Sequence, residues 1–122
     1  MRRRDERGSI LIETVVAIPA LVFATVVIVQ GLVFASGLGA VDVAAKDAAR
    51  AAADSCSAVS PWDAAQRALP DFAVLRTVET PSSGDDVLAR VHAGMRFRVG
   101  SLSLAEFEVV RDAEMPRMAS CR

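Results

Sequence analysis

An acidic residue stands at the edge of the longest apolar stretch of the chain. Glu13 follows three apolar residues and precedes Thr14–Val41, which runs for 28 residues without a formal charge. On insertion scales, placing an acidic side chain near the middle of a bilayer costs about 2.5–3.5 kcal/mol of free energy, and less toward the edge. One interpretation is a carboxylate that reaches the water interface beside Arg7. The alternative is a carboxylate that lies in the apolar layer and needs a positively charged partner there.

The other side chains that could take part in chemistry are isolated in the sequence. His92 is the only histidine, and Cys56 and Cys121 lack the close ligand spacing of a zinc finger. We find no glycine-rich phosphate loop, nucleophile elbow or pair of catalytic carboxylates in the sequence. Lys plus Arg is 14 and Asp plus Glu is 15, a balance too even for a nucleic-acid binder. We therefore expect no enzymatic activity, no metal, no cofactor and no nucleic-acid partner.

The uncharged run predicts a single transmembrane helix. About 20 helical residues cross a hydrocarbon core of about 30 Å, so we place the span at about Thr14–Ala35. The preceding MRRRDERG carries four arginines against two acids, and the first charge on the far side is Asp42. The positive-inside rule therefore predicts a single-pass protein of the cytoplasmic membrane, with a cytoplasmic N-terminus and an extracytoplasmic C-terminal region. A cleaved secretory signal with a site at Val33–Ala35 is the alternative, but its apolar core is typically about 7–15 residues.

Small and helix-bending residues inside the apolar run suggest how it packs. Pro19 removes one backbone hydrogen bond and is expected to bend the helix near Val15–Ile18. Gly31, Ala35 and Gly39 recur at intervals of four, so they form a stripe along which another helix can approach closely. The chance composition of an apolar helix is the alternative interpretation of this stripe.

The residues around Glu13 resemble a known processing signal. Gly8 is followed by Ser9 and three apolar residues before Glu13, an order that resembles a type IV prepilin signal. The run RGSILIETVVAIPALVF, with its Ile18-Pro19 pair, is similar to the start of TadE-like proteins of the tight-adherence (Flp) pilus system. The alanine-rich VDVAAKDAARAAA, Val41–Ala53, is similar to the actinobacterial members of that group.

This resemblance implies a processed filament subunit. A membrane-embedded prepilin peptidase would cut after Gly8 and leave Ser9 as the new amino terminus. Glu13, then the fifth residue, would pair with the amine of a neighbouring subunit. Removal of eight residues from 122 leaves 114, longer than a major Flp pilin, so the resemblance favours a minor pilin or pseudopilin. Its partners would be the peptidase, other pilin and pseudopilin subunits, the pilus assembly platform and membrane lipid, and the filament would serve cell adhesion.

The expected organisation is a leader at residues 1–8, a transmembrane and stem helix at 9–58, and a small extracytoplasmic domain at 59–122. The leading alternative is an unprocessed single-pass membrane protein whose extracytoplasmic domain binds envelope components. The two interpretations share the membrane helix and differ in whether residues 1–8 are removed.

An α+β fold is expected after the span. The alanine-rich segment continues the helix, with Asp42 and Lys46 spaced as an ion pair, and its thin apolar face should pack closely on a sheet or a neighbouring subunit. The run Ser60-Pro61-Trp62-Asp63 predicts the start of a short second helix that ends before Pro70.

Strand patterning begins after this short helix. Three antiparallel strands are expected at residues 72–80, 87–99 and 104–112, with turns at 81–86 and 100–101. In the second strand, apolar odd positions alternate with mostly polar even positions, which is the clearest strand signal of the chain. Its arginines are expected to pair with acids on the neighbouring strands, such as Glu79, Glu106 and Glu108. A phosphate or lipid-headgroup site on this face is the alternative.

A disulfide bond is expected between Cys56 and Cys121. Both cysteines fall on the extracytoplasmic side of the predicted topology, where a disulfide persists. Closing a loop of about 66 residues should stabilise the small domain by roughly 4 kcal/mol in the chain-entropy model. Two free thiols are the alternative.

Overall fold

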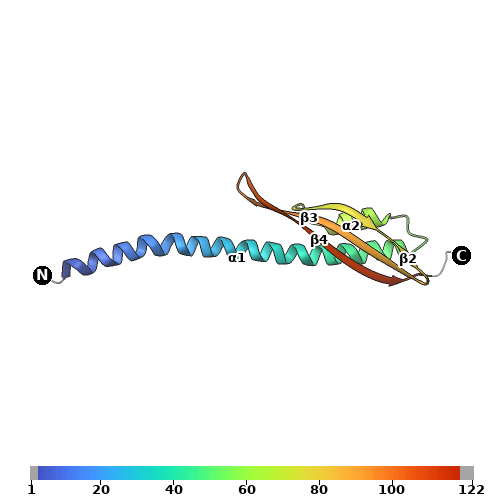
Figure 1. Cartoon of the computed structure of the whole chain (residues 1–122), viewed down its shortest axis with the longest axis horizontal. Coiled ribbons are helices and arrows are strands. Elements are labelled where there is room, and N and C mark those ends of the chain that lie inside the picture. Colours follow the sequence, from blue (N-terminus) through green and yellow to red (C-terminus); the bar gives the residue numbers. More distant parts are fainter. Residues whose placement is uncertain (1–2, 119–122) are drawn as a thin grey trace. The chain divides into compact units, whose positions relative to one another are not determined.

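The computed structural model describes residues 3–118, with side chains described from residue 11 onward except those of Val99 and Leu104. Six elements follow one another along the chain (Figure 1). They are α1 (Arg3–Ala53), α2 (Pro61–Ala68), β1 (Ala73–Glu79), β2 (Ser82–Ser83), β3 (Asp86–Val99) and β4 (Leu102–Pro116). The α+β class with a long N-terminal helix, a short helix and an antiparallel sheet is confirmed.

The chain divides into two compact units, Met1–Phe34 and Ala35–Arg122, so α1 contributes to both. The expected boundaries at residues 8/9 and 58/59 concern processing and membrane crossing, and they remain predictions. The alanine-rich part of α1 belongs to the same unit as the sheet.

The first unit consists of the N-terminal part of α1, whose large apolar side chains are exposed. Leu21 and Phe23 are examples, at 70% and 71% exposure. The helix continues through Pro19, and the bend expected there remains a prediction. Thr25 donates its hydroxyl to the carbonyl oxygen of Leu21 at 2.9 Å, which satisfies a polar group inside the apolar run. This helix is long and apolar enough to cross a membrane.

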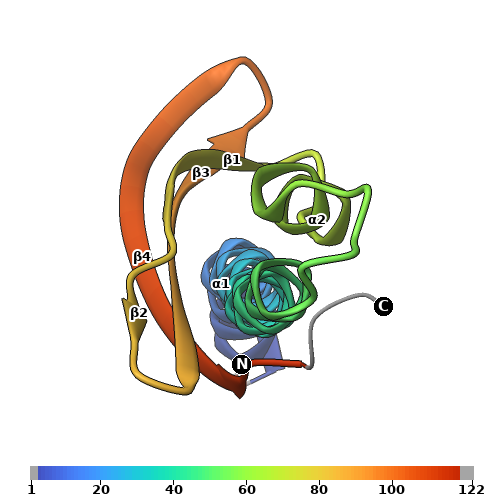
Figure 2. The ribbon, with the colours of Figure 1, turned by 90° about the vertical axis from the view of Figure 1, so that its right-hand side faces the viewer.

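The second unit has its core between the alanine face of α1 and one face of the sheet. Figure 2 shows the sheet curving around this part of α1, with α2 beside β1. The α1 residues that face this core are almost fully buried: Val41, Ala44, Ala45, Ala48, Ala49 and Ala53. Methyl side chains bury little area each, so the stability of this unit depends on the close approach that they permit.

The sheet is a meander centred on β3. β4 pairs with β3 along its whole length, from Asp86↔Pro116 to Val99↔Leu102, while β1 and then β2 pair with the other edge. The three expected strands are present. β4 is longer than expected at both ends, because the tight turn at Gly100, at φ +62°, lets pairing begin at Leu102, and pairing with the start of β3 extends it to Pro116. The expected turn at 81–86 contains the additional two-residue strand β2 and Gly84, at φ +64°.

The alternation predicted for the middle strand is confirmed from Val87 to Met95. Val87, Ala89, Val91, Ala93 and Met95 are buried against the helix side, at 4% exposure or less. Successive strand residues point to opposite faces, so the polar residues between them lie on the outer face of the sheet.

Gly37 of α1 lets Met95 and Phe72 approach the helix closely, and this role was not predicted from the sequence. A Cβ atom on Gly37 would collide with the sulfur of Met95 and lie 3.1 Å from Cε2 of Phe72. Gly37 and Met95 are both buried, so the missing side chain of the glycine lets the helix and the sheet pack closely around Met95.

The local signals for the helices are confirmed. Lys46 Nζ lies 2.7 Å from Asp42 Oδ2, one helical turn apart. Ser60 caps α2, because its hydroxyl oxygen accepts a hydrogen bond from the Asp63 backbone N–H at 3.1 Å. The Ser60 hydroxyl also donates to Asp63 Oδ2 at 2.7 Å, so both capping groups are satisfied.

Candidate functional site

The residues of the expected cleavage site lie in α1. Gly8 and Ser9 have helical backbone, and the side-chain surroundings of residues 1–10 lie outside the described part of the structure. The side chain of Arg7 falls in the same range, so its expected proximity to Glu13 remains a prediction.

Glu13 occupies an exposed position on a face of α1 that is otherwise apolar. Val16, Ala17 and Ala20, three, four and seven residues further on, share its side of the helix, together with Ile12. These spacings place the carboxylate in line with small and branched apolar side chains. A carboxylate in this position is well placed to be desolvated when another helix or lipid covers the face.

The residues of the small stripe leave open space around their backbone. A Cβ on Gly31, in the first unit, would meet nothing within 4 Å. In the second unit, Gly39 is equally open and Ala35 is exposed. The stripe therefore takes no part in the intramolecular contact that Gly37 makes, and its role in packing against another helix remains a prediction.

Cys56 lies just beyond the end of α1, in a turn stabilised by its neighbour. The Cys56 backbone N–H donates to Asp54 Oδ1 at 3.0 Å. Cys56 is disulfide-bonded. Its expected partner, Cys121, lies outside the described residues, so the pairing itself remains a prediction.

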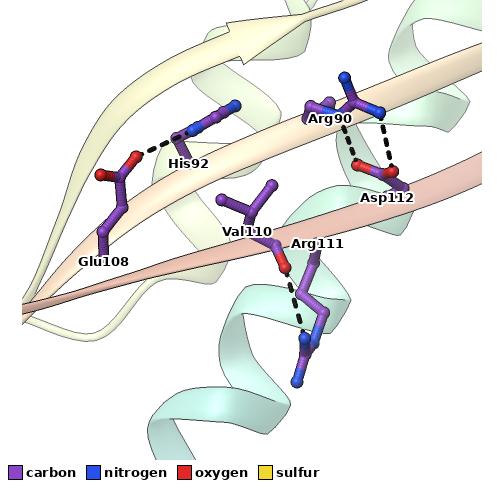
Figure 3. A network of polar contacts seen from close by, with 6 residues as sticks. All are labelled: Arg90, His92, Glu108, Val110, Arg111 and Asp112. Atoms are coloured by element: carbon purple, nitrogen blue, oxygen red, sulfur yellow. Dashed lines mark hydrogen bonds and ion pairs between the residues drawn. The ribbon is translucent and has the colours of Figure 1, made fainter.

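The outer face of the sheet carries a row of cross-strand ion pairs. Arg90 on β3 binds Asp112 on β4 in a bidentate manner, at 2.9 Å and 3.1 Å (Figure 3). The hydrogen bond from Arg90 lowers the pKa of the Asp112 carboxyl, and the same bond raises the pKa of Arg90. His92 Nδ1 lies 2.9 Å from Glu108 Oε1 on β4, also shown in Figure 3.

A second cluster on this face joins three strands. Arg76 on β1 binds Glu106 on β4, and Arg96 Nε on β3 lies 3.5 Å from the other oxygen of the same carboxylate. The hydrogen bond from Arg76 is the largest cause that lowers the pKa of Glu106. Gly94 lies between them, where a Cβ would stand 2.9 Å from Glu106 Oε1 and 3.2 Å from Arg76 Nε.

These contacts agree in part with the pairs expected from the sequence. Glu106 does face an arginine of β3, Arg96, whereas Glu108 faces His92 and not an arginine. Glu79 lies opposite Arg90 in the register, but Arg90 hydrogen-bonds Asp112 on the other side. Asp112 was not predicted as a partner of Arg90, because only the β3–β4 register shows that it lies directly opposite Arg90.

The geometry of this face is that of a structural network. Among the residues that the structure describes, no three His, Cys, Asp or Glu side chains come together as a metal site. His92 is held by one carboxylate, with no nucleophile in the contacts described for it. The chain's own arginines therefore satisfy these acids, and the residues expected to act in assembly lie on α1 instead.

Comparisons with known proteins do not assign the chain to a family. No family model, curated protein or solved structure matches it.

Proposed function

We propose that the chain is a minor pilin or pseudopilin of a tight-adherence filament, of the TadE-like type. In this proposal prepilin peptidase removes residues 1–8, α1 anchors the subunit in the cytoplasmic membrane, and residues beyond the span lie on the extracytoplasmic side. The observation that carries the proposal is Glu13, five residues after Gly8, on the apolar face of an exposed helix.

Exposure of the first unit supports a role that requires lipid or protein around α1. Large apolar side chains between Leu11 and Val33 are more than a third exposed. A contiguous apolar surface of this kind is not stable in water, and it marks a membrane or protein contact. A filament subunit meets both environments in turn: lipid before assembly and neighbouring helices after it.

The charge of Glu13 would make the transfer of the subunit from lipid to a filament selective for processed chains. A lone carboxylate and a lone amine are each costly in an apolar setting, and together they are much less so. Cleavage after Gly8 would create such an amine on Ser9. A subunit with its leader still attached would lack this amine, so processing and assembly would be coupled.

The second unit supplies a compact head for such a subunit. Its core lies between the alanine face of α1 and the sheet, and the acids and arginines of the outer face mostly satisfy one another. The apolar face that carries Glu13 is therefore the part of the described chain that most needs a partner. We propose that this partner is another pilin or pseudopilin helix, guided by the assembly platform.

Intact mass of the membrane-extracted protein tests the processing step. We expect cells with an active prepilin peptidase to yield a chain that begins at Ser9, and cells without the enzyme to yield the full chain. Gly8→Val, which changes the residue before the cut, should block processing, whereas Glu13→Gln should leave it intact.

Other measured masses would assign this chain to a different class of protein. A chain that keeps residues 1–8 beside an active peptidase would overturn the proposal in favour of an unprocessed single-pass protein. A chain that begins after Ala35 would instead identify a secretory signal.

A further inference from the structure

Strand β4 forms an edge of the sheet that no other described strand covers. It pairs with one side of β3, whereas β1 and β2 pair with the other side. The opposite edge strand, β1, has α2 beside it (Figure 2). From Ala105 to Met115 the register of β4 with β3 is unbroken, over a length of about 34 Å. Within residues 3–118, the outer side of β4 is therefore a continuous, unpaired strand edge.

Two backbone hydrogen bonds show which residues of β4 face this edge. The Arg96 N–H donates to the Phe72 carbonyl oxygen at 3.3 Å, so even-numbered residues of β3 face β1. The Leu88 N–H donates to the Pro81 carbonyl oxygen at 3.1 Å, in agreement with this order. Odd-numbered residues of β3 therefore bond to β4, because backbone groups alternate between the two sides of a strand. By the register, five residues of β4 turn their backbone groups to the free edge: Glu106, Glu108, Val110, Asp112 and Glu114.

The side chain of Arg111 marks the same edge. Its Nη1 donates to the Val110 carbonyl oxygen at 3.3 Å (Figure 3), so this oxygen has room for a donor on the side away from β3. The hydrogen bond is exposed and comes from one flexible side chain. An incoming strand can displace it at small cost, because an exposed guanidinium group regains hydrogen bonds to water.

The side chains along this edge are mostly acidic. Four of its five residues are acids, and all of them lie on the outer face of the sheet. Arginines hold Glu106 and Asp112. Glu108 is held by His92, which is a cation only when protonated, and Glu114 has no ion-pair partner among the described residues. Negative charge is therefore in excess beside the unpaired backbone groups.

This charge disfavours pairing between two copies of β4. A two-fold antiparallel pairing centred on Val110 would place Glu108 of one copy opposite Asp112 of the other. Like charges directly opposite each other destabilise a cross-strand pair. On the inner face, Phe107 is 52% exposed and offers apolar contact. The edge therefore favours a strand from another protein, with basic residues on its outer face and apolar residues on its inner face.

We propose that the free edge of β4, residues 106–114, binds an extended basic segment of another protein as an additional antiparallel strand. The backbone of this segment pairs with the outward N–H and C=O groups, which supply affinity. Its basic side chains lie opposite the acids of the edge, because directly opposite residues of an antiparallel pair share a face. The contact requires neither cleavage after Gly8 nor filament assembly, so it can fail while the proposed function stands.

Peptides added to the full-length chain in an uncharged detergent test this interface. The probe is a short peptide in which lysine alternates with valine. One control peptide carries glutamate in place of each lysine. A second control is N-methylated on the backbone at each lysine, so it keeps the charge and loses the donors that would face β4. Fluorescence anisotropy of labelled peptide measures binding, and NMR measures hydrogen exchange of the β4 amides.

We expect the lysine peptide to bind and to slow hydrogen exchange at the N–H groups of Glu108, Val110 and Asp112. These are amides of the free edge, which the ladder with β3 does not protect. The glutamate peptide should bind more weakly because its charges repel the acids of the edge. The N-methylated peptide should bind more weakly because it cannot complete the backbone pairing.

Two pairs of variants locate the contact. Val110→Pro removes an N–H that β3 does not use, so it should abolish binding, whereas Val110→Thr should retain it. Glu114→Lys should weaken binding of the lysine peptide severalfold and strengthen binding of the glutamate peptide. Glu79→Lys makes the same charge change on β1 and should leave both affinities nearly unchanged. Fluorescence of Trp62 reports whether each variant is folded, and Glu114→Lys decides the outcome if Val110→Pro is not.

Three results would overturn the proposal. Equal binding of the N-methylated peptide would mean that charge alone attracts the lysine peptide. Unchanged hydrogen exchange along residues 106–114, with or without binding, would mean that the edge accepts no strand. A dimer of the chain in native mass spectrometry that Val110→Pro abolishes would identify a second copy as the occupant.

Discussion

Arg76 on β1 and Glu106 on β4 form an ion pair that crosses over β3 at Gly94. The two residues are 30 positions apart in the sequence and on strands that do not pair with each other. Any side chain at position 94 would stand between the two groups. The outer face of the sheet thus joins all three long strands through side chains as well as through backbone pairing.

Acid should weaken this network first. Arg76 and Arg90 hold the pKa values of Glu106 and Asp112 below their ordinary values of 4.5 and 3.8. A carboxyl whose pKa is lower in the folded state stabilises the fold fully above its unfolded pKa, and that stability is lost as the pH falls through the folded pKa. We therefore expect the thermal midpoint of the full chain in detergent to fall as the pH is lowered below these ordinary values.

The arginines provide the comparison for this experiment. The fluorescence of Trp62, the only tryptophan, follows unfolding of the second unit. Arg76→Gln should lower the midpoint at neutral pH and flatten its decline in acid, and Arg90→Gln should act in the same direction. Arg117→Gln, exposed at the other end of the sheet, should keep the wild-type decline. An unchanged acid profile in Arg76→Gln would contradict the assigned pairing.

Two glycines of α1 should respond in opposite ways to the same substitution. Gly37→Ala forces a methyl group against Met95 in a packed core, which typically costs about 1–3 kcal/mol. Gly39→Ala meets open space and removes a flexible residue from a helix, so it should be neutral or stabilising by about 0.5–1 kcal/mol. Thermal midpoints of the two variants in detergent measure the difference, and equal midpoints would argue against the close contact of Gly37 with the sheet.

Removal of the charge at Glu13 should separate folding from assembly. Glu13 is exposed on the part of α1 in the first unit, so Glu13→Gln should insert, fold and be cleaved like the wild type. It should be lost from filaments sheared off the cell surface, because the amine of Ser9 would lack its partner. Glu13→Asp, which keeps the charge, should recover part of the incorporation. Normal incorporation of Glu13→Gln would remove the pairing role.

The cysteines should form one bridge within the chain. Under non-reducing electrophoresis the wild type should migrate faster than after reduction, and Cys121→Ala should abolish this shift. Loss of a closed loop of about 66 residues should also cost roughly 4 kcal/mol of stability. Equal migration with and without reductant, or a dimer-sized band that disappears on reduction, would contradict a bridge within the chain.

Local signals in the sequence predicted most of the fold because they act over short distances. The cap at Ser60, the ion pair of Lys46 with Asp42, and the alternation along residues 87–99 each involve neighbours within four positions. The extent of β4 and the strand β2 were missed, because pairing with β3 extends them beyond what their own residues favour.

Contacts between distant residues could not be predicted in the same way. Asp112 was missed as the partner of Arg90, and Gly37 was missed while Gly31 and Gly39 were singled out. All three glycines lie in the same helix, and periodicity alone does not indicate which of them faces the sheet. The outcome depends on how β3 and Phe72 approach α1, which is a property of the folded unit.

The amino-acid sequence alone determined the uncharged run, the acid at position 13, the strand alternation and the cysteines, because composition and periodicity are local properties of the chain. Only the tertiary structure decided which acid each arginine binds and which glycine makes room for Met95. These depend on strand register and on helix-to-sheet packing, in which a shift of one residue would exchange every inner side chain for an outer one.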